Sequence, residues 1–296
     1  MSAFGYFGSK KRIAKKILNK LPPHNAWVEL FCGSAAMTMA KKKAQLEVIN
    51  DINSDIVNFY MQLRNHRAQL IKAVHYTPYA REELTLARQP VPAETPISEL
   101  EKARRFFVTA MMAINGAFGK DQGGFSYTNS YTRNGTEARV SRWKMMPTHL
   151  EKVAERLRDV RIEKKDALVL LENFANRPAT LVYVDPPYLG ERAMGYMHEA
   201  NERIFHLSLL KALKKAKCMI FVSGYDNALY NEHLSQAAGW KKVTFVAHTK
   251  GNDGRKHARN EIVWMNAAFV RAQKQKIAPI ILTKKELRNK KVNPVR

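Results

Sequence analysis

The sequence predicts an α/β fold, a mostly parallel sheet that is interrupted by a helical insertion and ends in an antiparallel hairpin. Apolar runs at residues 27–31, 181–184 and 219–223 are each followed by Gly, Pro or Asp and then by a helical pattern. Strands that alternate with helices in this way are typical of a parallel sheet. The alternation stops between residues 62 and 158, where helical patterns dominate, so we expect this stretch to be inserted into the sheet domain.

The first half of the chain begins with a basic segment and two strands. The run at residues 27–31 is the expected first strand, and residues 47–50 form a second strand-like run. Helical periodicity then covers residues 98–114 and 148–158. A polar, Gly-rich stretch at residues 115–147 predicts a long loop between these helices.

The second half returns to strands. Residues 160–162 continue the sheet, and residues 243–247 and 261–266 flank a polar, Gly-rich loop that predicts an antiparallel hairpin. Together these patterns predict the following organisation: a Rossmann-like domain at residues 1–61 and 159–270, an insertion at residues 62–158, and a basic tail at residues 271–296.

The charge of the chain points to a polyanionic partner. Fifty Lys and Arg stand against 26 Asp and Glu, which gives a net charge of +24 and a pI near 10.0. Such an excess repels itself in a compact protein, and nucleic acid would relieve the repulsion. Ribosomal proteins and membrane-surface proteins are the other classes with this balance.

Other classes are disfavoured by composition. Two cysteines, Cys32 and Cys218, are too few for a disulfide framework or a four-ligand zinc site, and they are expected to be buried thiols in a cytosolic protein. The N-terminal residues lack the apolar core of a signal peptide. No stretch is apolar over the roughly 20 residues that a membrane span needs, so no membrane partner is expected.

A turn suited to a cofactor follows the first strand. The segment from Glu29 to Ala35 contains Gly33 and small residues, which let a ligand approach the backbone. The full dinucleotide fingerprint is missing, so a pyrophosphate cofactor is disfavoured. Asp51 follows the second strand, where an acid binds ribose hydroxyls in Rossmann-like folds. The alternative is an ordinary turn, with Asp51 capping a helix that begins near Ser54.

The most specific signal follows the strand at residues 181–184. It is the tetrapeptide Asp185-Pro186-Pro187-Tyr188. The two prolines fix the backbone and remove two amide donors, so the Asp185 carboxylate and the Pro186 carbonyl could accept hydrogen bonds from one amino group. Tyr188 offers a flat face on which a base could stack. The alternative is a proline turn capped by an aspartate.

These elements, in this order, resemble the Dam-type DNA adenine-N6 methyltransferases. A segment with Tyr6, Gly8 and Lys10 comes first, and the turn with Glu29, Phe31 and Gly33 follows. Next come residues 50–53 (Asn-Asp-Ile-Asn), a target-recognition insertion, the Asp-Pro-Pro-Tyr motif, and residues 259–266, which look like the family's closing strand. The resemblance covers about residues 1–270 and is weakest in the insertion.

The resemblance implies S-adenosylmethionine as cofactor and a role for each matching residue. Tyr6 and Lys10 would border the methionine end of the cofactor and the target base. The remaining cofactor residues would be Glu29, Phe31, Gly33, Asp51, Asp166, Ala167 and Asp185. Asp185, Pro186, Pro187 and Tyr188 would form the catalytic tetrapeptide. No metal is expected.

The resemblance implies methyl transfer to adenine N6 in duplex DNA, after the base has been flipped out, by direct in-line displacement. The nearest alternatives are the same chemistry on RNA or on cytosine N4, and a non-catalytic DNA-binding protein with a degenerate methyltransferase fold. A cognate restriction endonuclease is a further expected partner, in the cytoplasm of a bacterium or from a phage genome. The recognition sequence is not assumed to be GATC.

Sequence reading is expected from the loop at residues 115–147. Its cations are Lys120, Arg133, Arg139, Arg142 and Lys144. Arginine binds guanine through two hydrogen bonds, and aromatic residues of the loop, Trp143 among them, could fill the gap left by a flipped base. The alternative is a solvated loop on a helical subdomain, with base reading by helices within residues 62–114.

Overall fold

A computed structural model provides the structure of the chain. It describes residues 2–5, 14, 17–114, 116–117, 123–131, 135–187, 203–250 and 256–279, with the backbone alone at 246–250 and 256–259. Five predicted site residues lie outside the described residues: Tyr6, Lys10, Lys120, Arg133 and Tyr188.

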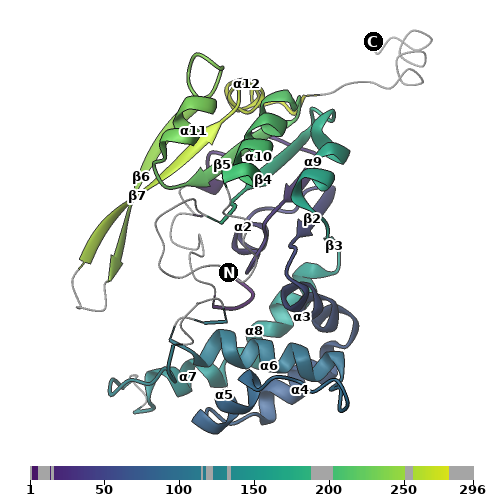
Figure 1. Cartoon of the computed structure of the whole chain (residues 1–296), viewed down its shortest axis with the longest axis vertical. Helices are drawn as coiled ribbons and strands as arrows, with labels where there is room; N and C mark the ends of the chain where they lie inside the picture. The colour runs from purple at the N-terminus through teal and green to yellow at the C-terminus, as the bar shows by residue number, and fades with distance from the viewer. Residues whose placement is uncertain are drawn as a thin grey trace.

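One seven-stranded sheet forms the centre of the upper part of the molecule (Figure 1). Its strands are β1 (Ala26–Glu29), β2 (Leu46–Asn50), β3 (Val160–Glu163), β4 (Thr180–Val184), β5 (Met219–Gly224), β6 (Lys241–Lys250) and β7 (Lys256–Met265). The strand order is β3-β2-β1-β4-β5-β7-β6. Strands β1 to β5 are parallel, and β7 runs antiparallel to β5 and to β6. The predicted fold class is therefore confirmed.

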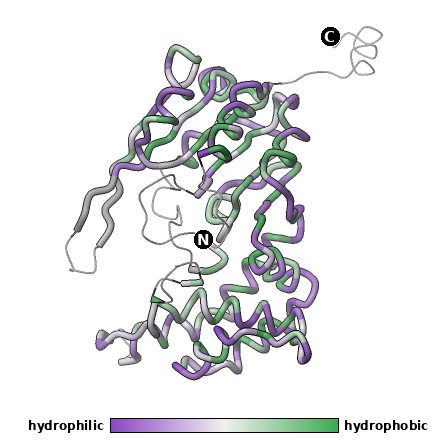
Figure 2. Tube along the Cα trace, in the orientation of Figure 1, coloured by the Kyte–Doolittle hydropathy of each residue, from purple (hydrophilic) through white to green (hydrophobic). Residues whose placement is uncertain are grey.

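The strands are apolar on both sides because helices cover both faces of the sheet. Val28, Val182 and Ile220 pack with helices on one face. The neighbouring residues Trp27, Leu181 and Phe221 face the other way, into a second cluster. Figure 2 shows the resulting concentration of apolar residues along the central strands.

Helices α9 to α11 pack against the first of these faces and α12 against the second. The helices around the sheet are α2 (Ala36–Ala40), α9 (Ala167–Ala175), α10 (Arg203–Lys215), α11 (Ala228–His233) and α12 (Ala267–Gln275). In α12, the buried Phe269 lies 5.7 Å from Phe221 of β5, measured between ring centroids. The basic tail was expected to begin at residue 271, but residues 271–275 belong to α12. The contact of Phe269 with β5 shows that this helix packs against the sheet.

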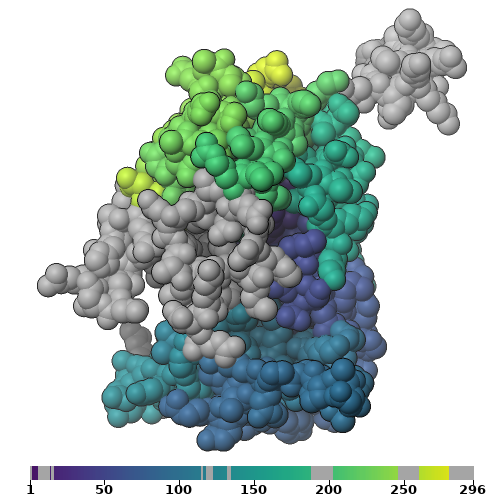
Figure 3. Space-filling model, viewed as in Figure 1, coloured from purple at the N-terminus to yellow at the C-terminus, as the bar shows by residue number. Residues whose placement is uncertain are grey.

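The helical insertion lies between β2 and β3 and forms the lower lobe of the molecule (Figure 3). It contains α3 (Ser54–Asn65), α4 (Arg67–Tyr76), α5 (Arg81–Arg88), α6 (Glu99–Met112), α7 (Ala138–Lys144) and α8 (Met146–Leu157). Asn53 and Ser98 are the N-caps of α3 and α6, and each side chain accepts backbone amide hydrogen bonds. Phe59 of α3 stacks on Phe107 of α6 with a centroid distance of 5.4 Å. The insertion begins earlier than the predicted residue 62, because α3 packs against α6 of the insertion.

Part of the loop expected at residues 115–147 is helical. Helix α7 occupies Ala138–Lys144, and α8 already begins at Met146. The N-cap of α7 is Glu137, whose side chain accepts a hydrogen bond from the amide of Val140 at 2.7 Å. Glutamate is not among the usual N-cap residues, so the sequence carries no ordinary start signal here.

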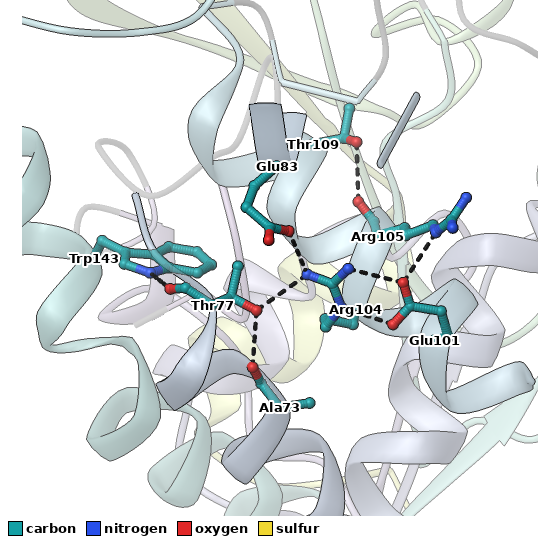
Figure 4. A network of polar contacts seen from close by, with 8 residues as sticks. All are labelled: Ala73, Thr77, Glu83, Glu101, Arg104, Arg105, Thr109 and Trp143. Atoms are coloured by element: carbon teal, nitrogen blue, oxygen red, sulfur yellow. Dashed lines mark hydrogen bonds and ion pairs between the residues drawn. The ribbon is translucent and has the colours of Figure 1, made fainter. Parts of the chain in front are cut away.

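A buried ion-pair network joins the helices of the insertion (Figure 4). Arg104 of α6 pairs with Glu101 and with Glu83 of α5, at 2.7 and 2.9 Å. Its Nη1 also donates to Thr77 Oγ1, at the end of α4, over 3.0 Å. The carbonyl of Thr77 accepts a hydrogen bond from Nε1 of Trp143 on α7 at 2.8 Å. The network therefore fixes α7 to the rest of the insertion.

The connections of the sheet define where a ligand would bind. From β1 the chain proceeds to β2 and β3 on one side, and it then returns to β4 and β5 on the other side of β1. The carboxyl ends of β1 and β4 are therefore adjacent at the point where the strand order reverses. Ligands of open α/β sheets bind in the crevice outside this point.

The hairpin of β6 and β7 is longer than the sequence predicted, and Figure 1 shows it projecting beyond the rest of the sheet. The residues that extend it, 248–250 and 256–260, show no alternation of apolar and polar residues in the sequence, so the sequence does not mark the ends of these strands. Among the described residues, no helix is long and apolar enough to cross a membrane.

Candidate active site

The turn after β1, called the glycine turn below, contains two residues with left-handed backbone conformation. Gly33 has φ 45° and Ala35 has φ 48°, both in the left-handed region. Glycine adopts this conformation without steric cost, whereas alanine does not. The amide of Cys32 donates to the carbonyl of Asn50 at 2.8 Å, which joins the turn to the end of β2.

Asp51 holds this turn and does not cap a helix. Its Oδ2 accepts a hydrogen bond from the amide of Gly33 at 2.9 Å, and its Oδ1 accepts one from the amide of Asn53 at 3.0 Å. The side chain that caps α3 belongs to Asn53. The alternative in which Asp51 is the helix cap is therefore wrong. The carboxylate lies beside the glycine turn, at the place where a ribose-binding acid is expected.

Glu29 is a buried acid at the end of β1. It is 2% exposed, and its Oε2 accepts hydrogen bonds from the amide of Thr38 at 3.1 Å and from the Thr38 hydroxyl. Burial is the main cause that raises the pKa of Glu29, to about 8, and the nearby Asp185 carboxylate raises it further. Glu29 is therefore mostly protonated at neutral pH, and a cationic group placed beside it would favour its ionised form.

Asp185 follows β4 and is held by the neighbouring strand. Ser223 of β5 donates a hydrogen bond from Oγ to Asp185 Oδ1 at 2.9 Å. The Ser223 hydroxyl is also 2.8 Å from the Tyr183 hydroxyl. Ser223 and Tyr183 are 1% exposed, and burial raises the pKa of Tyr183 well above its usual value. This buried relay fixes the orientation of the Asp185 carboxylate.

The structure brings the glycine turn and the Asp-Pro-Pro segment to the same edge of the sheet. Glu29 is in register with Tyr183, two residues before Asp185. Pro186 is buried and Pro187 is half-buried. Phe31 lies edge-on to Phe205 of α10, with 6.2 Å between ring centroids.

Asp166 and Ala167 lie beyond β3 on the same edge. Asp166 is exposed and caps α9, because its Oδ1 accepts hydrogen bonds from the amides of Leu168 and Val169 at 2.7 and 3.3 Å. Ala167 is the first residue of that helix and is buried. The capping contacts give Asp166 a structural role, and its contact with the adenine ring stays a prediction.

The predicted DNA-binding residues that the structure describes lie on α7. Arg142 and Lys144 are exposed, and Arg139 is half-buried. Trp143 is only 6% exposed and is tied to Thr77, so the interpretation of Trp143 as a residue that fills the gap of a flipped base is wrong. Tyr127 and Tyr131 of the same region are 67% and 78% exposed.

Several residues of the site were missed by sequence reasoning. Thr38, Tyr60 and Ser223 contact Glu29, the Gly33 carbonyl and Asp185 respectively. Ser223 carried a weak signal, since it is a polar residue at the end of an otherwise apolar strand. Thr38 and Tyr60 lie in helical patterns in which their polar groups have no distinguishing neighbours.

One cavity among the described residues lies away from this edge. Its volume is about 650 Å³, and Leu213, Trp240 and Arg271 are among the residues that line it. These residues come from the C-terminal end of α10, the start of β6 and α12, at the opposite edge of the sheet. Within the described part of the chain, no group of His, Cys, Asp and Glu side chains is arranged to hold a metal ion.

Replacement of Ser223 by Ala is expected to lower, about tenfold, the turnover number of the methyl transfer that the resemblance implies. The affinity for S-adenosylmethionine should stay unchanged. The variant removes the hydrogen bond that orients Asp185 but none of the contacts of the glycine turn. Steady-state kinetics and calorimetry measure the two effects separately. Tyr183→Phe removes the outer hydroxyl of the relay and should have a smaller effect. An unchanged turnover number in Ser223→Ala would show that Asp185 is oriented by other contacts.

The fold and this edge define a class: a doubly wound sheet with a glycine turn after β1 and a Pro-rich acidic motif after β4, at the edge where ligands of such sheets bind. Residues 6–248 match the D12 class N6 adenine-specific DNA methyltransferase family. Because the match covers most of its length, the chain belongs to this family.

A DNA N-6-adenine-methyltransferase of Escherichia phage P1 is 27% identical over 125 residues. These residues are 42% of this chain, and the matched part is 16% of that relative, so the similarity covers a small part of the relative's length.

Solved structures resemble the chain weakly. A precorrin 8w decarboxylase from Methanobacterium thermoautotrophicum is 9% identical with a TM-score of 0.38, over 89% of this chain and 95% of that chain. A SAM-dependent methyltransferase from Agrobacterium tumefaciens is 10% identical with a TM-score of 0.39, over 89% of this chain and 63% of that chain.

The methyl donor of this family is S-adenosylmethionine. The residues at the edge of the sheet fit it. The Gly33 turn allows a close approach to the backbone, Asp51 supplies an acid beside that turn, and the buried Glu29 would be stabilised in its ionised form by a cationic group.

Proposed function

We propose that the protein transfers a methyl group from S-adenosylmethionine to N6 of an adenine that is flipped out of duplex DNA. The observation that carries this proposal is the position of Asp185. It follows β4 at the point where the strand order reverses, beside the glycine turn of β1, and Ser223 orients it.

Asp185 and Pro186 would activate the adenine amine. The nitrogen lone pair is delocalised into the ring, so the amine is a poor nucleophile. The Asp185 carboxylate and the Pro186 carbonyl would accept hydrogen bonds from its two hydrogens and favour the pyramidal nitrogen of the transition state. Ser223 holds the carboxylate in place before the base arrives, so little reorganisation is needed.

The glycine turn would bind the cofactor. Asp51 would accept hydrogen bonds from the ribose, and Glu29, Phe31 and Gly33 would line the methionine part. When bound, S-adenosylmethionine supplies a methyl group on a positively charged sulfur, which is activated for direct in-line displacement. The protein's contribution is alignment, worth up to about 7–11 kcal/mol for a well-placed pair.

The DNA would be held by the net positive charge and by α7. The charge of +24 favours binding to the phosphate backbone. Unpairing and unstacking of the adenine cost a few kcal/mol, and stacking on Tyr188 would return about 1–3 kcal/mol of this.

Cofactor affinity is expected to rise with pH up to about 8. Below the raised pKa of Glu29, binding of the cationic methionine end must displace a proton, so affinity should change by up to about tenfold per pH unit. Calorimetry at several pH values measures this. Glu29→Gln is the matched control, because it keeps the ligand's own titration and removes that of Glu29. Parallel pH profiles of the two proteins would contradict a role of Glu29 ionisation.

Base reading is proposed for Arg139 and Arg142 of α7. Replacement of one of them by Ala should relax the preference at a single base pair by about 1–3 kcal/mol if that residue contacts a base. Single-molecule sequencing of DNA from cells that express each variant measures the preference. A uniform loss of affinity for all sequences would assign the residue to a phosphate contact.

The proposed function is tested by transfer of labelled methyl groups. Unmethylated plasmid DNA, its single strands and cellular RNA are offered to the protein, and the products are digested to nucleosides. N6-methyladenine in the duplex is the expected product. N4-methylcytosine, methylated RNA alone, or no label at all would contradict the proposal. A restriction endonuclease of the same specificity and a cytoplasmic location stay predictions.

A further inference from the structure

The helical insertion forms two hydrogen bonds with the glycine turn, the turn after β1 that contains Gly33, and with the start of α2 that follows it. Tyr60 of α3 donates a hydrogen bond from its hydroxyl to the carbonyl of Gly33 at 2.8 Å. Arg156 of α8 donates from Nη2 to the carbonyl of Thr38 at 2.9 Å. The Tyr60 side chain is fully buried, and that of Arg156 is 10% exposed. Gly33 lies in the turn and Thr38 lies in α2. Each of them therefore accepts a hydrogen bond from a helix of the insertion.

The described N-terminal residues make a third connection. His149 of α8 contacts the carbonyl of Ser2 through Nε2 at 2.7 Å, and the amide of Ala3 donates to the carbonyl of Ser34 at 3.0 Å. Phe4 packs edge-on to Phe59 of α3, with 5.4 Å between ring centroids. This short segment therefore lies between the insertion and the glycine turn and contacts both.

Arg156 also belongs to a buried ion cluster. Its Nη1 is 2.5 Å from Oε2 of Glu47, and Nζ of Lys41 is 2.6 Å from Oε1 of the same carboxylate. The side chains of Glu47 and Lys41 are 1% and 2% exposed. Buried charges are tolerated only when their partners are well placed, so the cluster fixes the position of α8 against β2.

Thr38 carries the contact from Arg156 to the cofactor site. Its amide and hydroxyl both donate to Oε2 of Glu29, while its carbonyl accepts the hydrogen bond from Arg156. Nε1 of Trp27 donates to the Thr38 hydroxyl oxygen at 2.7 Å, which sets the direction of that group. A shift of α8 would therefore move Thr38 and, with it, the carboxyl group of Glu29.

We propose that Arg156 and Tyr60 are positioning residues through which the helical insertion sets the affinity of the cofactor site. This inference rests on the proposed function, since it makes binding of DNA to the insertion and binding of S-adenosylmethionine to the turn energetically coupled. Such coupling is reciprocal, so DNA must change cofactor affinity by the same factor as the cofactor changes DNA affinity.

Arg156→Lys is the first test. Lysine keeps a cation for Glu47, but one ammonium group replaces the planar fork that reaches both Glu47 and Thr38. The KM for S-adenosylmethionine should rise about 3- to 10-fold with little change in kcat. In the Glu29→Gln background the same substitution should have no further effect. Arg158→Lys is the matched control, because Arg158 is 70% exposed and pairs only with Glu155 among the described residues. A proportional loss of kcat, or an undiminished effect in the Glu29→Gln background, would overturn the assignment.

Tyr60→Phe gives a second test that leaves the ion cluster intact. The affinity for S-adenosylhomocysteine, the product that has no methyl group left to transfer, is measured by calorimetry with and without unmethylated plasmid DNA. DNA should change the affinity of the unaltered protein several-fold, and this factor should fall toward one in Tyr60→Phe. A protein that binds the cofactor but shows no effect of DNA would contradict the coupling and leave the proposed function standing. A protein that binds no cofactor under any condition would contradict the proposed function itself.

Discussion

Asp185→Ala is expected to lower the rate of methyl transfer about 1,000-fold and to leave the fold intact. The substitution removes one of the two acceptors proposed for the adenine amine, and the loss of one preorganised polar group at a reacting centre has effects of about this size. Asp185 is half-buried, and its neighbours Val184 and Pro186 are buried, so the strand end should persist without the carboxylate. Single-turnover transfer of labelled methyl groups measures the rate.

Two controls separate catalysis from folding and from cofactor binding. Asp166→Ala removes an exposed carboxylate at the same edge of the sheet and should affect helix α9 and cofactor contacts, while the rate with saturating cofactor stays within a few-fold. Asp185→Asn keeps the shape and one acceptor, so its rate should lie between those of Asp185→Ala and the unaltered protein. A normal rate in Asp185→Ala would remove the residue from the mechanism.

Three strands buried on both faces were predictable from the sequence because each is a short, mostly apolar run that is closely followed by Gly, Pro or Asp. The run before Asp185 is β4 and the run before the Gly33 turn is β1, and these two strands are parallel neighbours in the sheet. Spacing cannot show this adjacency, since it arises from the reversal of strand order around β1. The resemblance to a known family supplied what periodicity could not.

Features that depend on tertiary contacts were not predictable. Helix α7 begins at a glutamate cap and is held by Trp143, so the local sequence resembles a polar loop. Residues 271–275 look like part of a basic tail because the apolar stripe of α12 is narrow, with only Phe269 and Ala272 buried. Ser223 and Thr38 acquire their roles from partners 38 and 9 residues away.

The ion-pair network of the insertion is the feature with the largest expected effect on stability. Arg104 is only 11% exposed at its side chain, and it pairs with both oxygens of Glu101, with Glu83 and with the Thr77 hydroxyl. Hydrogen bonds from Arg104 are the main cause that lowers the pKa of Glu101. The arginine therefore compensates two carboxylates in a region that water reaches poorly, and Figure 4 shows the four contacts converging on its guanidinium group.

Arg104→Ala is therefore expected to lower the free energy of unfolding by about 2–4 kcal/mol, somewhat less than for a fully buried pair because Glu83 and Glu101 are 24% and 30% exposed. Urea denaturation followed by circular dichroism measures it. Since the pKa of Glu101 is lowered in the folded state, its stabilisation is present above the ordinary glutamate pKa and lost as the pH falls below it. The difference between the two proteins should therefore shrink in acid.

Lys102→Ala is the matched control for this prediction, because Lys102 lies on the same helix and pairs with Glu99 at 2.6 Å, with side chains 39% and 58% exposed. An exposed pair of this kind contributes about 0–1 kcal/mol. Thr77 also accepts the hydrogen bond from Trp143, so Arg104→Ala should loosen α7 and weaken discrimination between DNA sequences, whereas Lys102→Ala should not. Equal losses of stability in the two variants, or full discrimination in an Arg104→Ala protein that is clearly destabilised, would show that the network does not hold the proposed reading helix in place.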